Sequence, residues 1–146
     1  MTALSSFTLV TLLGLVLVGC VAPGAEMART SENGGMLRGS VAYRERVALP
    51  TDAVVEVRLF DVSVQDIAAP VVAETAIAAG GRQVPIPFEL KYDPSKIRKD
   101  RTYAVRATIH SAGRMIFTTD SGHRVITQGN PTRVDLWLVR VSGPKR

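Results

Sequence analysis

The feature that most constrains the fold is a hydrophobic period of two, which runs from Leu37 to Val141. In residues 83–92, for example, apolar side chains alternate with polar residues and prolines. Successive side chains of a strand point to opposite faces, so this pattern predicts strands with one buried face. The region lacks the long 3.6-residue period of an amphipathic helix. An all-β fold is therefore expected.

About seven or eight short strands are expected, separated by turns. They cover residues 37–43, 53–61, 67–79, 83–92, 102–111, 114–119, 124–126 and 132–141. Pro85 and Pro87 predict that the fourth segment is an edge strand or is interrupted, because proline has no N–H for the ladder. Asp93 and Pro94 predict a capped turn or one helical turn after it. Strands spaced for hairpins favour an antiparallel β-sandwich.

An uncharged apolar stretch, residues 7–19, precedes the only cysteine of the chain. It is shorter than the roughly 20 residues that span a bilayer, and it matches the apolar core of a signal peptide. Leu17, Val18 and Gly19 before Cys20 fit a lipobox, in which a small residue precedes the acylated cysteine. Several acyl chains on Cys20 would give stable membrane anchoring.

Residues 1–6 contain no Lys or Arg, which departs from the usual start of a signal peptide. Either the terminal amine serves alone, or the true start lies upstream. An alternative interpretation of Cys20 is a buried cysteine that closes an apolar helix. Residues 21–36 are small or polar and predict a flexible tether. The expected parts are a signal peptide (1–19), the lipidated cysteine and tether (20–36), the domain (37–141) and a tail (142–146).

The net charge is +5, and all 18 basic residues follow residue 28. A basic domain can bind nucleic acid, but an exported one meets anionic lipid instead, so no nucleic-acid partner is expected. Solubility explains a charged surface equally well. A local cluster contains Lys91, Lys96, Arg98, Lys99 and Arg101. Contact with anionic headgroups, contact with an acidic partner segment, and an ordinary solvated loop all remain open for it.

The last expected strand is apolar on both faces. One face carries Val134, Leu136 and Leu138, and the other carries Trp137, Val139 and Val141. Two interpretations remain open: a central strand covered on both faces, or an exposed apolar groove that receives a partner peptide. The candidate partner contacts are therefore Trp137, Val139, Lys96, Arg98, Lys99 and Arg101.

Residues for catalysis or metal binding are few. His110 and His123 do not lie in a nucleophile context such as G-x-S-x-G, and Asp120 with His123 is too small a set to predict a metal site. Gly80-Gly81 lacks the rest of a phosphate-binding loop and predicts a hairpin turn. We therefore expect no enzyme activity, no metal, no small-molecule substrate and no cofactor besides the covalent lipid.

Several segments, taken in order, resemble the YbaY/YscW family of bacterial lipoproteins. They are Gly39–Tyr43, Val55–Leu59, Pro87–Pro94, Tyr103–Ile109, Gly113–Asp120 and Val125–Gly129. Their order and spacing between Gly39 and Leu138 carry the resemblance, and the lipobox agrees with it. The resemblance implies a β-sandwich of transthyretin-like (prealbumin-like) topology and an outer-membrane anchor that faces the periplasm. Val21, rather than Asp, after the cysteine also favours sorting to the outer membrane.

Some members of that family resemble pilot lipoproteins, which escort or stabilise the secretin ring of a type III secretion system. Others are general envelope lipoproteins. The expected function is thus a lipid-anchored partner-binding or chaperone module without enzyme activity, whose partner is an envelope or secretion-apparatus protein. The alternatives are a structural or stress-related envelope lipoprotein without a dedicated client, and a secretin pilot.

Overall fold

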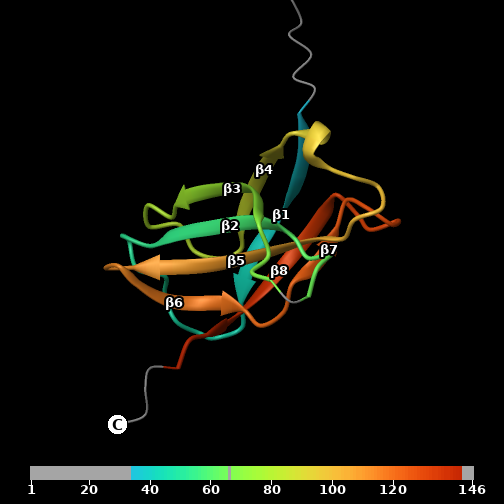
Figure 1. Ribbon diagram of the computed structural model, residues 1–146. Coiled ribbons are helices and arrows are strands. Elements are labelled where there is room, and N and C mark those ends of the chain that lie inside the picture. Colours follow the sequence, from blue (N-terminus) through green and yellow to red (C-terminus); the bar gives the residue numbers. More distant parts are fainter. Residues whose placement is uncertain (1–33, 66, 143–146) are drawn as a thin grey trace, which may run out of the picture. The chain divides into compact units, whose positions relative to one another are not determined.

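The computed structural model describes residues 34–65 and 67–142 (Figure 1). Eight strands and one short 3-10 helix make up this region. They are β1 (Gly35–Tyr43), β2 (Val54–Asp61), β3 (Val71–Ala78), β4 (Ile86–Tyr92), η1 (Pro94–Lys96), β5 (Tyr103–Ser111), β6 (Arg114–Thr119), β7 (His123–Val125) and β8 (Arg133–Arg140). The all-β prediction is confirmed. No helix among these residues is long and apolar enough to cross a membrane.

All eight strands belong to one sheet, in the order β3-β2-β5-β6-β8-β1-β4, with β7 paired to β5. The pairings are antiparallel except that of β1 with β8, which is parallel. The two outermost strands, β3 and β4, lie side by side without a hydrogen-bonded ladder. The sheet is therefore curled into a nearly closed, barrel-like ring (Figure 1).

This arrangement corrects the expectation of an antiparallel β-sandwich. The strands form one continuous sheet rather than two, and the first and last strands run parallel. Period-two alternation shows which face of a strand is buried, but it does not say which strands are neighbours. The transthyretin-like topology stays a prediction. The strand boundaries also differ: β3 begins at Val71 rather than Ile67, and β4 at Ile86 rather than Gln83.

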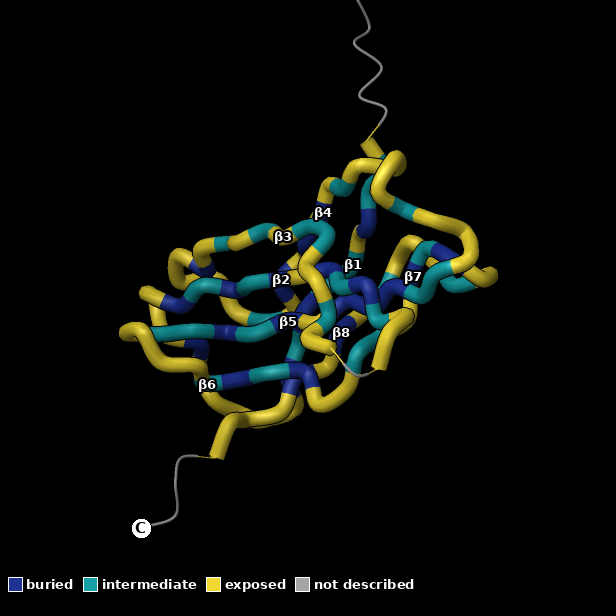
Figure 2. Tube along the Cα trace, in the orientation of Figure 1, coloured by how far each residue is buried: buried dark blue, intermediate teal, exposed yellow. Residues whose placement is uncertain are grey.

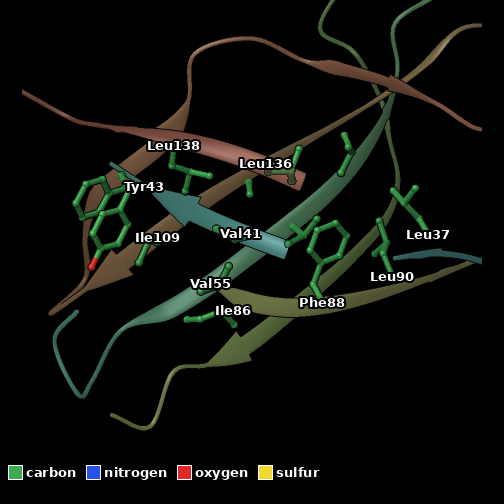
Figure 3. Packing of buried hydrophobic residues seen from close by; sticks show 14 of the residues in the cluster. Leu37, Val41, Tyr43, Val55, Ile86, Phe88, Leu90, Ile109, Leu136 and Leu138 are labelled. Carbon is green, nitrogen blue, oxygen red and sulfur yellow. The ribbon is translucent and has the colours of Figure 1, made fainter. Parts of the chain in front are cut away.

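The buried faces of the strands meet inside the ring (Figures 2 and 3). Fully buried aliphatic side chains dominate this core, and the largest fully buried side chain is the aromatic Tyr103. Tyr43 and Phe117 stack with ring centroids 4.2 Å apart and nearly parallel planes. Each large aliphatic side chain contributes about 1.5–3 kcal/mol when removed from water, so this core is the main source of stability.

Two glycines permit close contacts along β1. A Cβ atom at Gly39 would overlap the backbone carbonyl of Val134 on β8, and one at Gly35 would overlap the Tyr92 ring. Gly35 and Met36 were assigned to the tether, but they belong to β1 and pair with Tyr92 and Lys91. Glycine is uncommon in strands, and here it marks the close approach of a neighbour.

Several local predictions are confirmed. β4 is an edge strand, paired only with β1, and its Pro87 points outward. Asp93 caps η1 by accepting a hydrogen bond from the Ser95 backbone N–H at 2.9 Å. Gly80 and Gly81 form the expected turn after β3, with φ of +56° and +82°, but the strands that it joins are not paired as a hairpin.

Candidate partner-binding site

The outer face of β8 exposes a row of apolar side chains. Trp137, Val139 and Val141 are 51%, 45% and 37% exposed, while Leu136 and Leu138 between them are buried. Ala42 of β1 lies beside Trp137 in the parallel ladder. Ala42, Trp137, Val139 and Val141 are called the Trp137 face below. β8 is hydrogen-bonded on both sides, yet its outer face is exposed, so it is not a strand covered on both faces. Reception of a partner peptide on this face stays a prediction.

A hollow of about 380 Å³ adjoins Trp137. Its lining comes from β1, β8 and the segment before β4, and comprises Ser40, Ala42, Tyr43, Val84, Pro85, Asp135, Leu136 and Trp137. The Arg44 guanidinium lies over the indole, 5.5 Å from the ring centroid, which is within the range of a cation–π contact. The indole is thus positioned as one wall of a mainly apolar depression.

The walls of the hollow are held by contacts from the core. The Tyr43 hydroxyl donates a hydrogen bond to the Val47 carbonyl at 2.8 Å, which fixes the loop after β1. Burial, together with the charge of Glu45, raises the pKa of the Tyr43 phenol, so it stays protonated as this donor. Gln83 accepts a hydrogen bond from the Leu49 backbone N–H at 2.7 Å and joins that loop to the segment before β4.

The sequence predicted Trp137 and Val139 for this face but missed Tyr43, Arg44 and Pro85. Tyr43 ends the first expected strand, Arg44 follows it, and Pro85 lies inside the fourth expected strand. Only the sheet order β8-β1-β4 brings the three segments together. A cation beside an exposed aromatic residue is a common contact, so Arg44 was a weak candidate for pairing with Trp137. The two residues are far apart in the sequence, and nothing in the sequence showed that they meet.

The predicted basic contacts do not lie with the Trp137 face. Lys96, Arg98 and Lys99 are exposed in the connection between β4 and β5. That connection follows Tyr92, which pairs with Gly35 at the start of β1, whereas Trp137 pairs with Ala42 near the end of β1. The two sets of candidate contacts therefore lie toward opposite ends of β1, and they form separate surfaces.

Arg101 has a structural contact rather than a free guanidinium. Its Nη1 lies 2.7 Å from Asp61 Oδ2, and Asp61 is largely buried. Burial of the Asp61 carboxyl acts to raise its pKa, but hydrogen bonds from Ser63 and Arg101 and the charge of Arg101 outweigh it and lower the pKa. Arg101 thus fastens the β4–β5 connection to the end of β2.

The two histidines are far from any metal-binding arrangement. His110 Nε2 lies 3.2 Å from Thr108 Oγ1 and 3.9 Å from Glu56 Oε2 on the outer face of β5. His123 begins β7, one residue before the expected strand 124–126. Within residues 34–65 and 67–142, no three His, Cys, Asp or Glu side chains gather where a metal ion would bind. Cys20 and the lipobox residues Leu17, Val18 and Gly19 lie outside the described residues.

The fold and this site define a small all-β domain with an uncovered apolar sheet face and, among the residues described, no cluster of metal-ligating side chains. The family model of the type III secretion system lipoprotein chaperone YscW matches residues 32–138. The chain therefore belongs to the YscW family, as the resemblance implied.

Two known proteins are similar to the chain. The chain is 38% identical over 103 residues to the uncharacterized lipoprotein YbaY of Escherichia coli strain K12. This match covers 70% of the chain and 54% of YbaY, so the chain spans about half the length of that relative. The structure of an alternative pilotin from the type II secretion system of Vibrio cholerae is 43% identical with a TM-score of 0.73. That match covers 75% of the chain and 99% of the pilotin.

Proposed function

We propose that this protein is a lipid-anchored, non-enzymatic chaperone of the cell envelope, which binds a secretin or another envelope protein through the Trp137 face. The exposed apolar row on β8 carries the proposal. The exposed side chains of Trp137, Val139 and Val141 would lower the solubility of the protein if no partner covered them. The pilotin with a TM-score of 0.73 and the chaperone family support the kind of partner.

The anchor is the second part of the proposal. Cys20 would carry the lipid, preceded by Leu17, Val18 and Gly19, and residues 1–19 would be removed as a signal peptide. The lipid would hold the domain at the outer membrane on the periplasmic side, where a secretin subunit arrives. No cofactor other than the lipid takes part. Anchoring raises the effective concentration of the domain near a membrane-bound client.

The partner segment should be amphipathic, with an apolar side and a flank of acidic residues. The apolar side would cover Trp137 and Val139 and fill the neighbouring hollow. Arg44 over the indole supplies positive charge at its rim. Aromatic and arginine side chains contribute most of the binding free energy in many interfaces, so Trp137 should be the main contact.

Periplasmic crosslinking tests the proposed partner. A photo-crosslinking residue in place of Val139 should capture one envelope protein, and Trp137→Ser should reduce capture about 30-fold or more. The matched control is Ile67→Ser, which alters another exposed apolar side chain, 61% accessible, away from this face. Equal capture by the Trp137→Ser variant would contradict the assigned face. Capture of no partner above background would favour a general envelope lipoprotein without a dedicated client.

The lone tryptophan gives a direct binding measurement, because Trp137 is the only Trp in the chain. Purified partner should shift its fluorescence to shorter wavelength as the indole leaves water. Acyl labelling tests the anchor separately. Cys20→Ser should abolish incorporation of labelled fatty acid and leave the precursor uncleaved, and labelling that survives the substitution would contradict lipidation at Cys20.

A further inference from the structure

The second surface of the domain lies where the described chain begins. Gly35 pairs with Tyr92, and η1 follows Tyr92 directly, so η1 lies beside the start of β1 (Figures 1 and 2). The surface comprises Tyr92, Pro94, Lys96, Ile97, Lys99 and Ile126, and is called the tether-side surface. It lies at the end of β1 opposite Tyr43 and the Trp137 face.

Two ammonium groups on this surface are available to a ligand. Arg98 is engaged with Asp100 at 2.8 Å, and Arg101 with Asp61 at 2.7 Å. Lys96 and Lys99 are exposed and form no ion pair within 4 Å with a residue that the structure describes. Hydrogen bonds from Ser95 lower the pKa of the Asp93 carboxyl, and Asp93 lies close enough to Lys96 for the lysine charge to help. Residues 91–101 contain five basic residues and two aspartates, a net charge of +3. The surface therefore attracts anions.

An apolar depression of about 410 Å³ accompanies these charges. Tyr92, Pro94, Ile97 and Ile126 line it, together with Lys99 and parts of Thr127 and Gln128. Ile97 and Ile126 are only half-buried. Apolar side chains beside lysines are the combination that settles into the headgroup region of a bilayer.

Contacts from the core hold the tether-side surface in shape. The buried Tyr103 hydroxyl accepts a hydrogen bond from the Arg98 backbone N–H at 3.0 Å and donates one to the Lys96 carbonyl at 3.2 Å. The Thr127 hydroxyl donates to the Arg101 carbonyl at 2.7 Å. Ile126 has φ of +72°, a conformation rare for a β-branched residue, and its backbone N–H donates to the Pro131 carbonyl. The surface is thus preformed rather than a loose loop.

We propose that the tether-side surface rests on a membrane that contains anionic phospholipid, with Lys96 and Lys99 on lipid phosphates and Ile97 and Ile126 among the headgroups. This inference rests on the proposed anchor at Cys20. Only residues 21–33 separate that cysteine from Gly34 in the sequence. The end of the domain that joins this tether is the end that meets the bilayer. Docking there directs the Trp137 face away from the lipid.

Hydrogen–deuterium exchange of the full acylated protein in lipid nanodiscs tests the inference. The nanodiscs contain phosphatidylcholine alone or phosphatidylcholine mixed with phosphatidylglycerol. Backbone amides at residues 95–99 and 126–128 should exchange more slowly in the anionic nanodiscs. Each lysine near an anionic surface accounts for about a fivefold change in binding, so the double variant Lys96→Glu and Lys99→Glu should remove the protection.

The matched control is the double variant Arg114→Glu and Arg140→Glu, which changes the net charge equally through exposed arginines of β6 and β8. It should keep the protection. Equal loss in both variants, or equal exchange in both kinds of nanodisc, would overturn the assigned surface. Protection by free polyglutamate without protection by anionic nanodiscs would also overturn it, in favour of an acidic protein segment. Mass spectrometry that finds no acyl group would instead contradict the anchor, which separates the two failures.

Discussion

At the scale of single residues, Gly39 shows how one position permits the contact of two strands. Its Cα faces the Val134 carbonyl so closely that a Cβ atom has no room. Gly39 pairs with Val134 in the parallel ladder between β1 and β8. A side chain there would push the first and last strands apart. The residue follows a tether rich in glycine, so the sequence alone gave little reason to distinguish it from its neighbours.

Gly39→Ala should destabilise the protein by about 1–3 kcal/mol, because the backbone of β8 has to move to admit the methyl group. The midpoint of urea unfolding, followed by circular dichroism, measures the change. Gly34→Ala is the control, since the nearest atom to its added Cβ is the Tyr92 carbonyl oxygen at 3.9 Å. Equal midpoints for the two variants would contradict the close contact with Val134.

A second residue-scale prediction concerns Asp61. Its pKa in the folded protein is lowered from 3.8, chiefly by hydrogen bonds from Ser63 and Arg101 that outweigh its burial. A carboxylate with a lowered pKa stabilises the fold fully above its unfolded pKa, and this stabilisation is lost as the pH falls through the folded value. The protein should therefore lose stability below about pH 4.

The Asp61→Asn variant should be about 1–2 kcal/mol less stable to unfolding at neutral pH, because Arg101 then keeps only a neutral hydrogen-bond partner. The variant should also show a shallower loss of stability between neutral pH and acid. Urea unfolding at a series of pH values measures both effects. Asp52, Asp93 and Asp100 also have lowered pKa values, so part of the slope should persist. An unchanged slope in the variant would show that Asp61 does not contribute to it.

At the scale of elements, two residues with positive φ form the turn of the hairpin between β5 and β6. Ala112 has φ of +46° and Gly113 of +73°, the pattern of a tight two-residue hairpin turn. Asp52 holds this turn by accepting hydrogen bonds from the Ala112 backbone N–H at 2.7 Å and the Ser111 hydroxyl at 2.9 Å. Alanine is strained in that region, whereas asparagine tolerates it.

Ala112→Asn should therefore stabilise the protein by about 0.5–1 kcal/mol, seen as a rise in the thermal midpoint. Gly113→Ala in the same turn should have the opposite effect, since it places a side chain at a φ suited to glycine. A lowered midpoint for Ala112→Asn would mean that the turn relies on a contact of the alanine methyl group instead.

The elements also show what the sequence could and could not predict. Alternation and β-branched residues predicted segments that overlap all eight strands, and prolines 85 and 87 predicted the edge position of β4. These patterns did not predict that β8 pairs in parallel with β1, because strands joined by short turns normally pair with their chain neighbours. The surroundings of the Trp137 face could not be predicted for the same reason. The exposure of Trp137 follows from β8 alone, but the positions of Arg44 and Pro85 beside it depend on the order β8-β1-β4.

At the scale of the whole molecule, the ring of strands is not fully closed. A seam without ladder hydrogen bonds lies between β3 and β4. β2 and β5 are each paired on both sides, while β3 and β4 each have one unpaired edge at the seam. Local opening is easiest where a strand has fewer ladder bonds and fewer buried side chains. β3 has no fully buried residue, whereas β2 has four buried residues in eight.

Amide hydrogen exchange should therefore be slowest in β2 and β5 and fastest, among the strands, in β3. The difference in opening free energy should amount to about 2 kcal/mol or more, because edge strands open without unfolding the ring. Mass spectrometry of peptides covering Val54–Asp61 and Val71–Ala78 measures it. Equal protection of the two strands would mean that the seam between β3 and β4 opens only on global unfolding.

The parallel contact of β1 with β8 has a kinetic consequence. Gly39 and Val134 are ladder partners separated by almost the whole domain, so the ring closes only after the last strand has become available. Contacts between distant parts of a chain slow folding, because the intervening loop has to be ordered first. The anchor proposed at Cys20 requires export, in which a chain crosses the membrane unfolded from its N-terminus. A ring that waits for its final strand lets transit finish before folding begins to compete with it.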